Sequence, residues 1–528
     1  MVKNSSISFL DIESIPQLIK DFLMQKVEGF GNQVFNDKNI EQQFQLKAQE
    51  FSPEKRQLLF DVLKEQYLGF KLSGRQEEYL NSVLQENTFT VTTGHQLNLF
   101  TGPAFFIYKI LQTIKLADEL NRKFPDRNTV PVFWMATEDH DFEEINNFKT
   151  ENSYYETKAK AGGAVGRIIV EDDFFISEFE KEFKDSVFGT ELILLMKKAY
   201  TKGNSLAKAT RILVQELFAG YGLLVIDSDD AKLKSQMKER FRNELLHREL
   251  LESTKNTVEY LSETYGKVQV NPREINLFYL TETRNRIEFN GEKFQIVDTD
   301  ITFSKEELLG ELEKHPEKFS PNALMRPVYQ ETVLPNLAYI GGNAEIMYWL
   351  ELKDYYEKTN LAFPILIPRV SLLFVREKNL EKIKKFGLEI HDFFRNFAVV
   401  TKENLLHDSE ILQLLDQEET SVSQRFDEIA AKASLTDKSF GSLVDAEKTR
   451  QLKSFSRMKK RLLRAEKIKQ QEKLERLEQL FLQIHPGKNW QERVFNFSVF
   501  YADLGHEWLQ NCYQEIEVYK SELIILSI

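Results

Sequence analysis

Apolar and polar positions recur along the chain in two rhythms, one typical of strands and one typical of helices. Residues 89–93 form a short β-rich run. After Pro103, apolar side chains recur every three or four residues over 107–120, which predicts a helix. Residues 130–136 are then continuously apolar, as in a strand that is covered on both faces. Together these segments predict a β-loop-α unit followed by a central strand.

The same order occurs twice more along the chain. Helical spacing over 204–219 leads into the apolar run "GLLVIDSDD", and helical spacing over 344–358 leads into "FPILIPRVS". Helices that alternate with buried strands indicate an α/β fold with a doubly wound parallel sheet. Long inserts separate these units, and in one of them Asn290-Gly291 lies between two alternating runs, which predicts a two-residue hairpin turn.

The strand signal fades from about residue 385, and 402–484 has helical spacing. Two seams of the coiled-coil type follow the 3-4-3 rule there, namely Phe455, Met458, Leu462 and Ala465, then Leu474, Leu477, Phe481 and Ile484. Residues 422–433 offer a partner helix, and "SLTDKSFGSL" between them predicts the turn of an antiparallel hairpin. The final stretch, "SELIILSI", predicts a returning strand.

The expected organisation therefore has three parts. Residues 1–385 form the α/β core, with inserts at about 150–200 and 230–335. Residues 386–488 form an α-helical coiled-coil domain, and 489–528 return to the core. A chain of 528 residues exceeds the usual size of a single hydrophobic core, which agrees with more than one module.

Charge and composition narrow the class of protein. The net charge of -12 argues against a globally basic nucleic-acid binder, and no run of 18 uncharged apolar residues predicts a membrane span. The lone cysteine, Cys512, fits a reducing cytoplasm and a packing role. Residues 448–476 carry 12 Lys and Arg against 3 Glu. A solvated helix face explains this excess better than a track for nucleic-acid phosphates, because no pattern of interleaved aromatic side chains supports base stacking there.

The first motif with candidate chemistry lies at the end of the first strand. Thr92, Thr93, Gly94 and His95 fit the pattern Thr/His-x-Gly-His, which resembles the nucleotide-binding signature of nucleotidylyltransferases and class I aminoacyl-tRNA synthetases. Backbone N–H groups of such a loop and of the following helix favour an anion, and the imidazole adds a donor. A histidine that only caps or bridges the turn is the alternative, since four residues are a weak motif.

The second motif, "TEDHDFEEIN", directly follows the strand at 130–136 and gathers carboxylates in one short loop. Such carboxylates bind an amine, a sugar hydroxyl or a metal, or one of them acts as a general base. Glu143 and Glu144 fit equally well the acidic first turn of a helix. The earlier residues favour function, namely Glu138, Asp139, His140 and Asp141. One histidine among acids lacks the spacing of zinc ligands, so we assign no metal ligand.

Arginines and a glycine pair mark further candidate positions. Arg273, Arg326 and Arg369 flank predicted strand or helix ends, and Ser371 follows the last of them. Guanidinium groups suit carboxylates and phosphates, although a single arginine is more often part of a structural ion pair. Gly341, Gly342 and Asn343 precede the helix at 344–358, and Glu345 lies in its first turn. These residues are candidates to bind an anion or a substrate at the start of that helix.

Several segments, in order, closely resemble the cysteine-adding enzymes of bacillithiol biosynthesis, a family of cysteine ligases. They are "TTGHQLNLFTGPAFFIYKI", "PVFWMATEDHDFEEIN", "AVGRI", "NPREINLFYL", "MRPVYQETVLPNLAYIGGNAEIMYWLELK" and "WQERVFNF". The resemblance implies a Rossmann-like core with connective inserts and a helical coiled coil that mediates homodimerisation. It also implies the last step of the pathway, in which the carboxyl group of L-cysteine is joined to the amine of glucosaminyl-malate.

Formation of that amide in water is uphill, so activation of the carboxylate by ATP or another nucleotide is the natural hypothesis, with Mg²⁺ as its expected companion. On this hypothesis Thr92, Thr93, Gly94 and His95 hold the nucleotide, with "PRVS" around Arg369 and Ser371 in place of the missing Lys-Met-Ser-Lys-Ser loop. Asp139 or Asp141 receives or deprotonates the amine, and Arg273 or Arg326 pairs with the malate carboxylates. The remaining substrate-binding candidates are Glu138, His140 and the residues from Gly341 to Glu345 named above.

Two other functions compete with this one. An aminoacyl ligase that acts with RNA would use the basic helix as its track, and a non-catalytic scaffold would use the core only to sense a nucleotide. The ligase hypothesis depends on one arrangement. The turn that holds His95 must face the same cavity as the acidic loop that follows Ala136.

Overall fold

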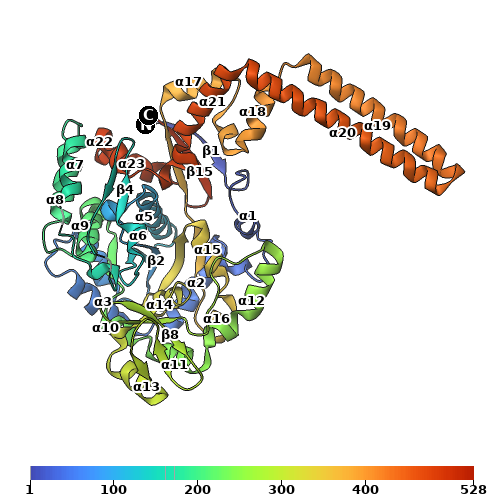
Figure 1. Cartoon of the computed structure of the whole chain (residues 1–528). Helices are drawn as coiled ribbons and strands as arrows, with labels where there is room; N and C mark the ends of the chain where they lie inside the picture. The colour runs from blue at the N-terminus through green and yellow to red at the C-terminus, as the bar shows by residue number, and fades with distance from the viewer. Residues whose placement is uncertain (1, 161, 172) are drawn as a thin grey trace. The chain divides into compact units, whose positions relative to one another are not determined.

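The computed structural model describes residues 2–160, 162–171 and 173–528 (Figure 1). These residues form two compact units. Unit 1 contains the described residues up to 11, together with 15–374 and 491–526, and unit 2 contains 12–14, 375–490 and 527–528. The sequence placed the helical part at 386–488 and the returning segment at 489–528. In the structure the chain leaves unit 1 after Phe374 and re-enters it at Gln491.

A five-stranded parallel sheet organises unit 1. In spatial order its strands are β6 (Leu224–Asp227), β3 (Asn128–Met135), β2 (Thr88–His95), β12 (Asn336–Gly341) and β13 (Ile365–Pro368). Every neighbouring pair is parallel. Numbered as they follow along the chain, the strands lie in the order 3-2-1-4-5, which is the Rossmann arrangement. The predicted parallel α/β sheet is confirmed.

Strands β2 and β3 are both buried on both faces, which the continuous apolar run at 130–136 predicted for β3. Seven of the eight residues of β2 are buried, and so are seven of the eight residues of β3. Helix α5 (Phe105–Lys123) packs against both strands, and its buried positions follow the predicted helical spacing. Helix α9 (Leu206–Phe218), capped by the Ser205 side chain, leads into β6 as the sequence indicated.

The strand order creates a crevice at the carboxyl ends of β2 and β12. From β2 the chain moves through β3 to β6 on one side, and then returns to β12 on the other side of β2. The loops that leave β2 and β12 therefore diverge, and open α/β sheets bind their ligands at such a switch point. His95 is opposite Met135 in the register of β2 and β3, so the loops after both strands begin at the same edge.

Two predicted elements are divided in the structure. The apolar run "FPILIPRVS" forms β13 and then β14 (Ser371–Val375), which belongs to another sheet, of order β1-β15-β14. Pro368 has no N–H for a ladder bond, and the next N–H, of Arg369, donates to Gly341 O at 2.8 Å and closes the β12 pairing. The helix expected at 344–358 is likewise two helices, α15 (Asn343–Leu350) and α16 (Lys353–Lys358).

Both expected inserts form part of unit 1. The first carries the hairpin of β4 (Asn147–Lys149) and β5 (Tyr154–Glu156) with α7 (Phe174–Phe183) and α8 (Gly189–Ala199). The second carries a mixed helical and antiparallel region: α10 (Ala231–Ser235), α11 (Lys238–His247), α12 (Glu249–Tyr265), α13 (Lys305–Lys314) and α14 (Met325–Val333), with β7 (Leu277–Leu280), β8 (Arg284–Phe289), β9 (Phe294–Ile296), β10 (Thr302–Phe303) and β11 (Phe319–Pro321). The predicted hairpin at Asn290-Gly291 joins β8 to β9, but residues 290–293 connect the two strands instead of the expected two residues, with Gly291 at a φ of +96°.

The ends of the chain complete unit 1. The predicted C-terminal strand is β15 (Glu522–Ser527), which lies between β1 (Val2–Ser8) and β14. Cys512 is fully buried, as its packing role required. The other helices of these segments are α1 (Gln17–Leu23), α2 (Asp37–Glu50), α3 (Pro53–Gln66), α4 (Gly74–Ser82), α6 (Phe142–Ile145), α22 (Ser498–Leu504) and α23 (His506–Glu515).

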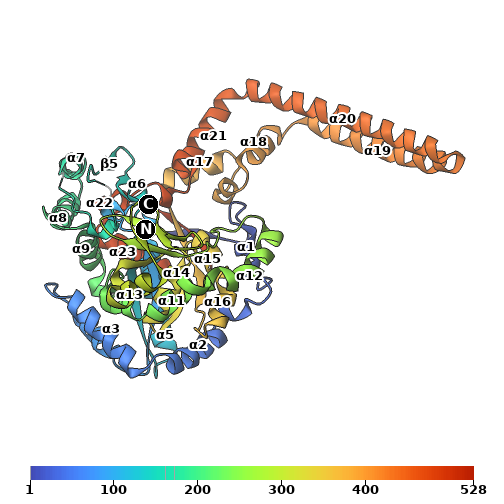
Figure 2. The same cartoon turned by 60° about the horizontal axis from the view of Figure 1, so that its bottom comes forward.

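Unit 2 is helical, with α17 (Glu377–Lys385), α18 (Phe397–Leu406), α19 (Glu410–Thr436), α20 (Lys438–Lys469) and α21 (Gln471–Ile484). Figures 1 and 2 show α19 and α20 as a long antiparallel hairpin. Asp437 caps α20 inside the predicted turn. Lys448 pairs with Asp427 at 2.5 Å, and Lys459 pairs with Asp416 and Glu419, so some of the basic charge of α20 is neutralised by α19.

Among the described residues, no helix has the length and apolar character needed to cross a membrane.

A buried ion pair joins α2 to α14. Lys47 Nζ lies 3.2 Å from Glu331 Oε2, and both side chains are wholly buried. Lys47→Met would leave the Glu331 carboxylate without its cation in the interior. We expect the free energy of unfolding to fall by roughly 3–5 kcal/mol, measured by urea denaturation. The double variant Lys47→Met/Glu331→Gln should regain most of that loss, and a loss below about 1 kcal/mol in the single variant would contradict the role of this pair.

Candidate active site

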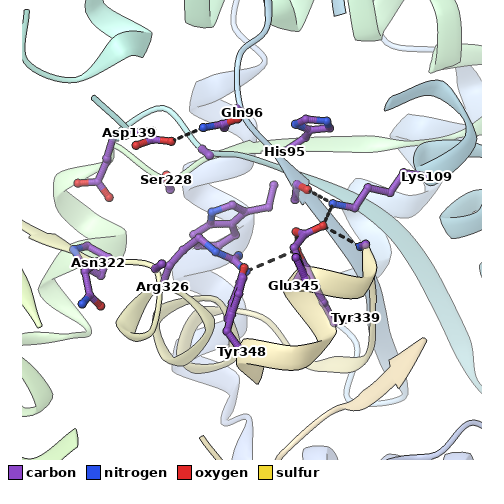
Figure 3. A pocket seen from close by; sticks show the side chains of 18 of the residues that line it. His95, Gln96, Lys109, Asp139, Ser228, Asn322, Arg326, Tyr339, Glu345 and Tyr348 are labelled. Atoms are coloured by element: carbon purple, nitrogen blue, oxygen red, sulfur yellow. Dashed lines mark hydrogen bonds and ion pairs between the residues drawn. The ribbon is translucent and has the colours of Figure 1, made fainter. Parts of the chain in front are cut away.

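A cavity of about 400 Å³ lies at the carboxyl edge of the sheet (Figure 3). The turn after β2 contributes Gly94 and His95, and the loop after β3 contributes Glu138 and Asp139. The two loops therefore open onto one cavity, which is the arrangement that the ligase hypothesis requires. Residues from α5, α14 and α15 complete the wall around the switch point.

Lys109 of α5 connects the two sides of this crevice. Its Nζ donates to Gly94 O at 2.6 Å and lies 2.6 Å from Glu345 Oε2 in α15. Burial lowers the pKa of Lys109, and the charge of Glu345 opposes that shift. Burial alone would raise the pKa of Glu345, but Lys109, the Tyr339 hydroxyl and the Gly342 N–H bring it to about 2. Glu345 is therefore ionised at neutral pH, and its charge lies against Lys109.

His95 faces this cavity as a neutral imidazole. The ring stacks on Phe105 with centroids 5.2 Å apart. Burial, and next the charge of Lys109, lower the pKa of His95 to about 3. Its Nε2 is shielded from solvent and has no hydrogen-bond partner within the described part of the chain. The imidazole can thus form a hydrogen bond to a ligand, whereas it is a poor acceptor of a full proton at neutral pH.

The two carboxylates after β3 have different environments. Asp139 accepts hydrogen bonds from Gln96 Nε2 and from the His140 N–H, both at 2.8 Å. Although burial raises its pKa, these donors and the charge of Arg284 hold it well below the ordinary value. Glu138 pairs with the buried Lys234, yet burial outweighs this pairing and raises the pKa of Glu138. Glu138 is therefore the better proton acceptor of the two.

Arg326 presents a half-buried guanidinium to the cavity. It donates to Gln330 Oε1 at 3.0 Å and to Tyr348 OH at 3.4 Å, and it lies over the Tyr339 ring. No carboxylate in the described ranges lies within ion-pair distance of it. A half-buried cation with no acidic partner among the described residues is suited to a carboxylate or phosphate of a ligand.

The cavity carries a positive surplus although the chain is acidic. Five cationic side chains line it, namely Lys109, Arg284, Arg326, Arg369 and Arg493, against three carboxylates, Glu138, Asp139 and Glu345. His95 is neutral, so the lining charge is five minus three, or +2. The chain as a whole carries -12. The site therefore favours anionic ligands.

The structure brings many of the sequence-predicted residues together. Those that line the cavity are Gly94, His95, Glu138, Asp139, Arg326, Gly342, Asn343, Glu345 and Arg369. Glu143 and Glu144 lie in the first turn of the short helix α6, which was one of their two open interpretations. Glu144 also accepts a hydrogen bond from Gln96 at 3.0 Å.

Other predicted residues lie away from the cavity wall. The Thr92 and Thr93 hydroxyls donate across to β12, to Asn336 Oδ1 and Ile340 O, both at 2.8 Å. The Ser371 hydroxyl donates to Glu492. The remaining four do not line the cavity either: Asp141, Arg273 and His140 are exposed, and Gly341 is paired with Pro368 in the sheet. His140 contacts Arg284, which does line the cavity.

Several lining residues were missed from the sequence. The main ones are Gln96, Lys109, Arg284, Tyr339, Tyr348 and Arg493. Lys109 carried a usable signal, because it is a single charge within the apolar segment "AFFIYKILQTI". Arg493 lies in the family-like segment "WQERVFNF", but neither it nor Arg284 carried a local pattern that placed it at this edge, since only the tertiary fold brings them there. Within the described ranges, no group of three or more His, Cys, Asp or Glu side chains is placed to hold a metal ion.

Comparison with known proteins assigns the chain to a family. The model of the N-terminal Rossmann-like domain of the bacillithiol biosynthesis protein BshC matches residues 6–370, and that of its C-terminal coiled-coil domain matches 372–528. The chain belongs to the BshC family.

Relatives extend this result over nearly the whole chain. A protein of Flavobacterium johnsoniae, named "Putative cysteine ligase BshC", is 40% identical over 97% of this chain and 97% of its own length. Relatives of the same name from Christiangramia forsetii and Salinibacter ruber are 37% and 30% identical, over 99% and 84% of this chain and 98% and 84% of their own lengths. The resemblance seen in the sequence is confirmed, including the Rossmann-like and coiled-coil parts.

Gly94 sits where a small change would alter the cavity and spare the fold. A Cβ built there would lie 3.5 Å from Arg326 Nη1 and 3.5 Å from Trp134 O, which are ordinary contacts. We expect Gly94→Ala to fold normally while its methyl group narrows the space beside Arg326. Affinity for an anionic ligand should fall about tenfold or more, because small displacements at such sites have large effects.

Equilibrium binding of L-malate and of ADP, measured by calorimetry beside a thermal melt, tests this expectation. Gly310→Ala is the matched control, because its added Cβ meets nothing within 4 Å. Unchanged affinity for both ligands in Gly94→Ala would show that the space beside Arg326 is not a ligand site.

Proposed function

We propose that the protein joins the carboxyl group of L-cysteine to the amine of glucosaminyl-malate, in the last step of bacillithiol biosynthesis, at the expense of a nucleotide. Membership of the BshC family supports the reaction class. The observation that carries the proposal is the single cavity where the Gly94-His95 turn, the Glu138-Asp139 loop and Arg326 meet, with surplus positive charge. The substrates and the nucleotide are all anionic or carry anionic groups.

The proposed reaction needs an activated carboxyl group. The nucleotide accepts attack by the cysteine carboxylate and releases either pyrophosphate or ADP. The free amine of the acceptor then attacks the activated carbonyl carbon, and AMP or phosphate leaves as the amide forms. ATP, accompanied by Mg²⁺, is the expected nucleotide. The reducing cytoplasm is the location proposed for this chemistry.

Side-chain roles follow from charge and environment. The Gly94 turn and the neutral His95 are suited to the nucleotide phosphates, and Arg326 to a malate carboxylate. An amine must lose a proton to become a nucleophile. Glu138 is proposed for that step instead of Asp139 or Asp141, because the pKa of Asp139 is low and Asp141 lies outside the cavity. Asp139 is better suited to hold the ammonium form.

The test supplies purified protein with L-cysteine, glucosaminyl-malate and ATP, and follows bacillithiol by mass spectrometry. We expect product together with either AMP or ADP, which distinguishes an adenylate from an acyl phosphate. Glu138→Gln should lower the rate at least about a hundredfold, as expected for loss of a general base. Tight binding of tRNA in place of product formation would favour the RNA-dependent alternative. ATP binding without any ligation would favour the scaffold.

We also propose that the protein is a homodimer through α19 and α20. These helices expose large apolar side chains, among them Ile411, Leu414, Ile429, Leu443 and Ile468. Single scattered apolar residues are ordinary on a surface, but so many on one hairpin favour a partner. Light scattering should give about twice the chain mass of 61.9 kDa.

Leu414→Glu/Leu443→Glu should shift the protein to monomer, since each carboxylate would be buried in the interface. Ser442→Glu adds the same charge at an exposed polar position and should leave the mass unchanged. A monomeric wild-type protein at micromolar concentration would contradict the proposed dimer.

A further inference from the structure

The C-terminal segment places two adjacent charged residues, Glu492 and Arg493, near the cavity, and their surroundings differ. Glu492 is 1% exposed and is fully engaged. Its Oε1 accepts from Arg369 Nη2 at 2.7 Å and from Ser371 Oγ at 2.9 Å, and its Oε2 accepts from the Leu372 N–H at 3.2 Å. The Arg369 charge is therefore neutralised inside unit 1.

Arg493 has no such neutralisation. Its side chain is exposed and lines the cavity. No carboxylate of the described chain lies within ion-pair distance of its guanidinium. The guanidinium lies 5.7 Å from the centroid of the Phe105 ring, and that of Arg369 lies 4.6 Å from the same centroid. Two guanidinium groups thus share one aromatic ring, while a single carboxylate neutralises only one of them.

The shared ring places this charge in the half of the cavity that contains His95. Phe105 also stacks on the imidazole of His95, at 5.2 Å between centroids. The other unpaired cation, Arg326, is instead surrounded by Tyr339, Tyr348 and Gln330. A ligand with negative charge at two places can therefore be held at two different cations. Guanidinium forks bind phosphate oxygens well, and His95 lies in the same half of the cavity with an Nε2 that has no hydrogen-bond partner among the described residues.

We infer that Arg493 binds the phosphate chain of the nucleotide in the proposed ligase reaction, and that Arg369 only maintains the fold beside it. This inference rests on the proposed function for the identity of the phosphate ligand. The sequence assigned phosphate binding to Arg369 and Ser371, but both side chains donate their hydrogen bonds to Glu492. The role is assigned instead to Arg493, more than a hundred positions later in the chain. The return of the C-terminal segment thereby completes the site.

Arg493→Met tests the inference, since it retains the stem over Phe105 and removes the charge. We expect the KM or Kd for the nucleotide to rise about tenfold or more, with less than about a threefold change for L-cysteine and for the sugar acceptor. Arg493→Lys should restore part of the affinity, because it retains the charge without the fork. Thermal stability should be unchanged, because Arg493 has no ion-pair partner among the described residues to lose.

Arg127→Met is the matched control, because Arg127 is also exposed and lies 5.9 Å from a phenylalanine ring, that of Phe44, just before β3. It should leave every constant unchanged. Unchanged nucleotide affinity in Arg493→Met, or a loss directed at the acceptor instead, would overturn the inference.

Binding measurements separate this inference from the proposed reaction. If no amide forms with any nucleotide, calorimetry with inorganic pyrophosphate, ADP and L-malate still applies. Pyrophosphate and ADP should bind more weakly to Arg493→Met than to the wild type, with a smaller dependence on salt, while L-malate binding stays the same. A wild-type protein that binds neither pyrophosphate nor ADP would refute the role of Arg493.

Discussion

The buried ammonium of Lys109 holds the two halves of the site at a fixed separation. Removal of a lysine from water is unfavourable unless its hydrogen bonds are replaced, and here a strand-end carbonyl and a carboxylate replace two of them. The carbonyl belongs to Gly94, at the end of β2, and the carboxylate to Glu345, in the first turn of α15. Gly94 lies just before the loop that leaves β2, and Glu345 lies just after the loop that leaves β12. Because these two loops diverge at the switch point, the width of the crevice depends on the side chain of Lys109, which joins their ends.

Local patterns predicted four of the five strands of the central sheet, because those strands are short, rich in apolar or β-branched residues and next to helices of regular spacing. The strand β12 was not predicted. These local patterns did not predict where an element ends when contacts with distant parts of the chain determine its end. Nothing in the helical spacing of 344–358 marks the break before Lys353, since neither glycine nor proline occurs there. The division of β13 from β14 carried a local signal in Pro368, but the sheet that receives β14 is formed with strands from both ends of the chain. Only a long-range pairing could reveal it.

Residues of the candidate site could be predicted when they lie in sequence next to the ends of the parallel strands, and not when they come from distant segments. His95, Glu138 and Asp139 follow strand ends directly, so the topology of a parallel sheet brings them together. Thr92 and Thr93 belong to the same motif, yet their hydroxyls bond to residues of β12. Side chains within a strand project from the two faces of the sheet and not from its carboxyl edge. Arg284 and Arg493 reach the cavity from a distant insert and from the C-terminal segment. No spacing rule connects such positions to the loops that they join.

The distribution of charge explains how an acidic protein can accept acidic ligands. Acids and bases inside unit 1 are paired in most places, as Lys47 is with Glu331, Lys234 with Glu138, and Arg369 with Glu492. Pairing limits the field of each group to its neighbourhood, so an arginine that lacks an acid determines the local potential more than the total charge of the chain does. Arg326 is such a group at one side of the cavity. The unpaired positive charge is therefore concentrated in the cavity at the carboxyl edge of the sheet. The net negative charge of the chain repels anions from the surface outside the cavity.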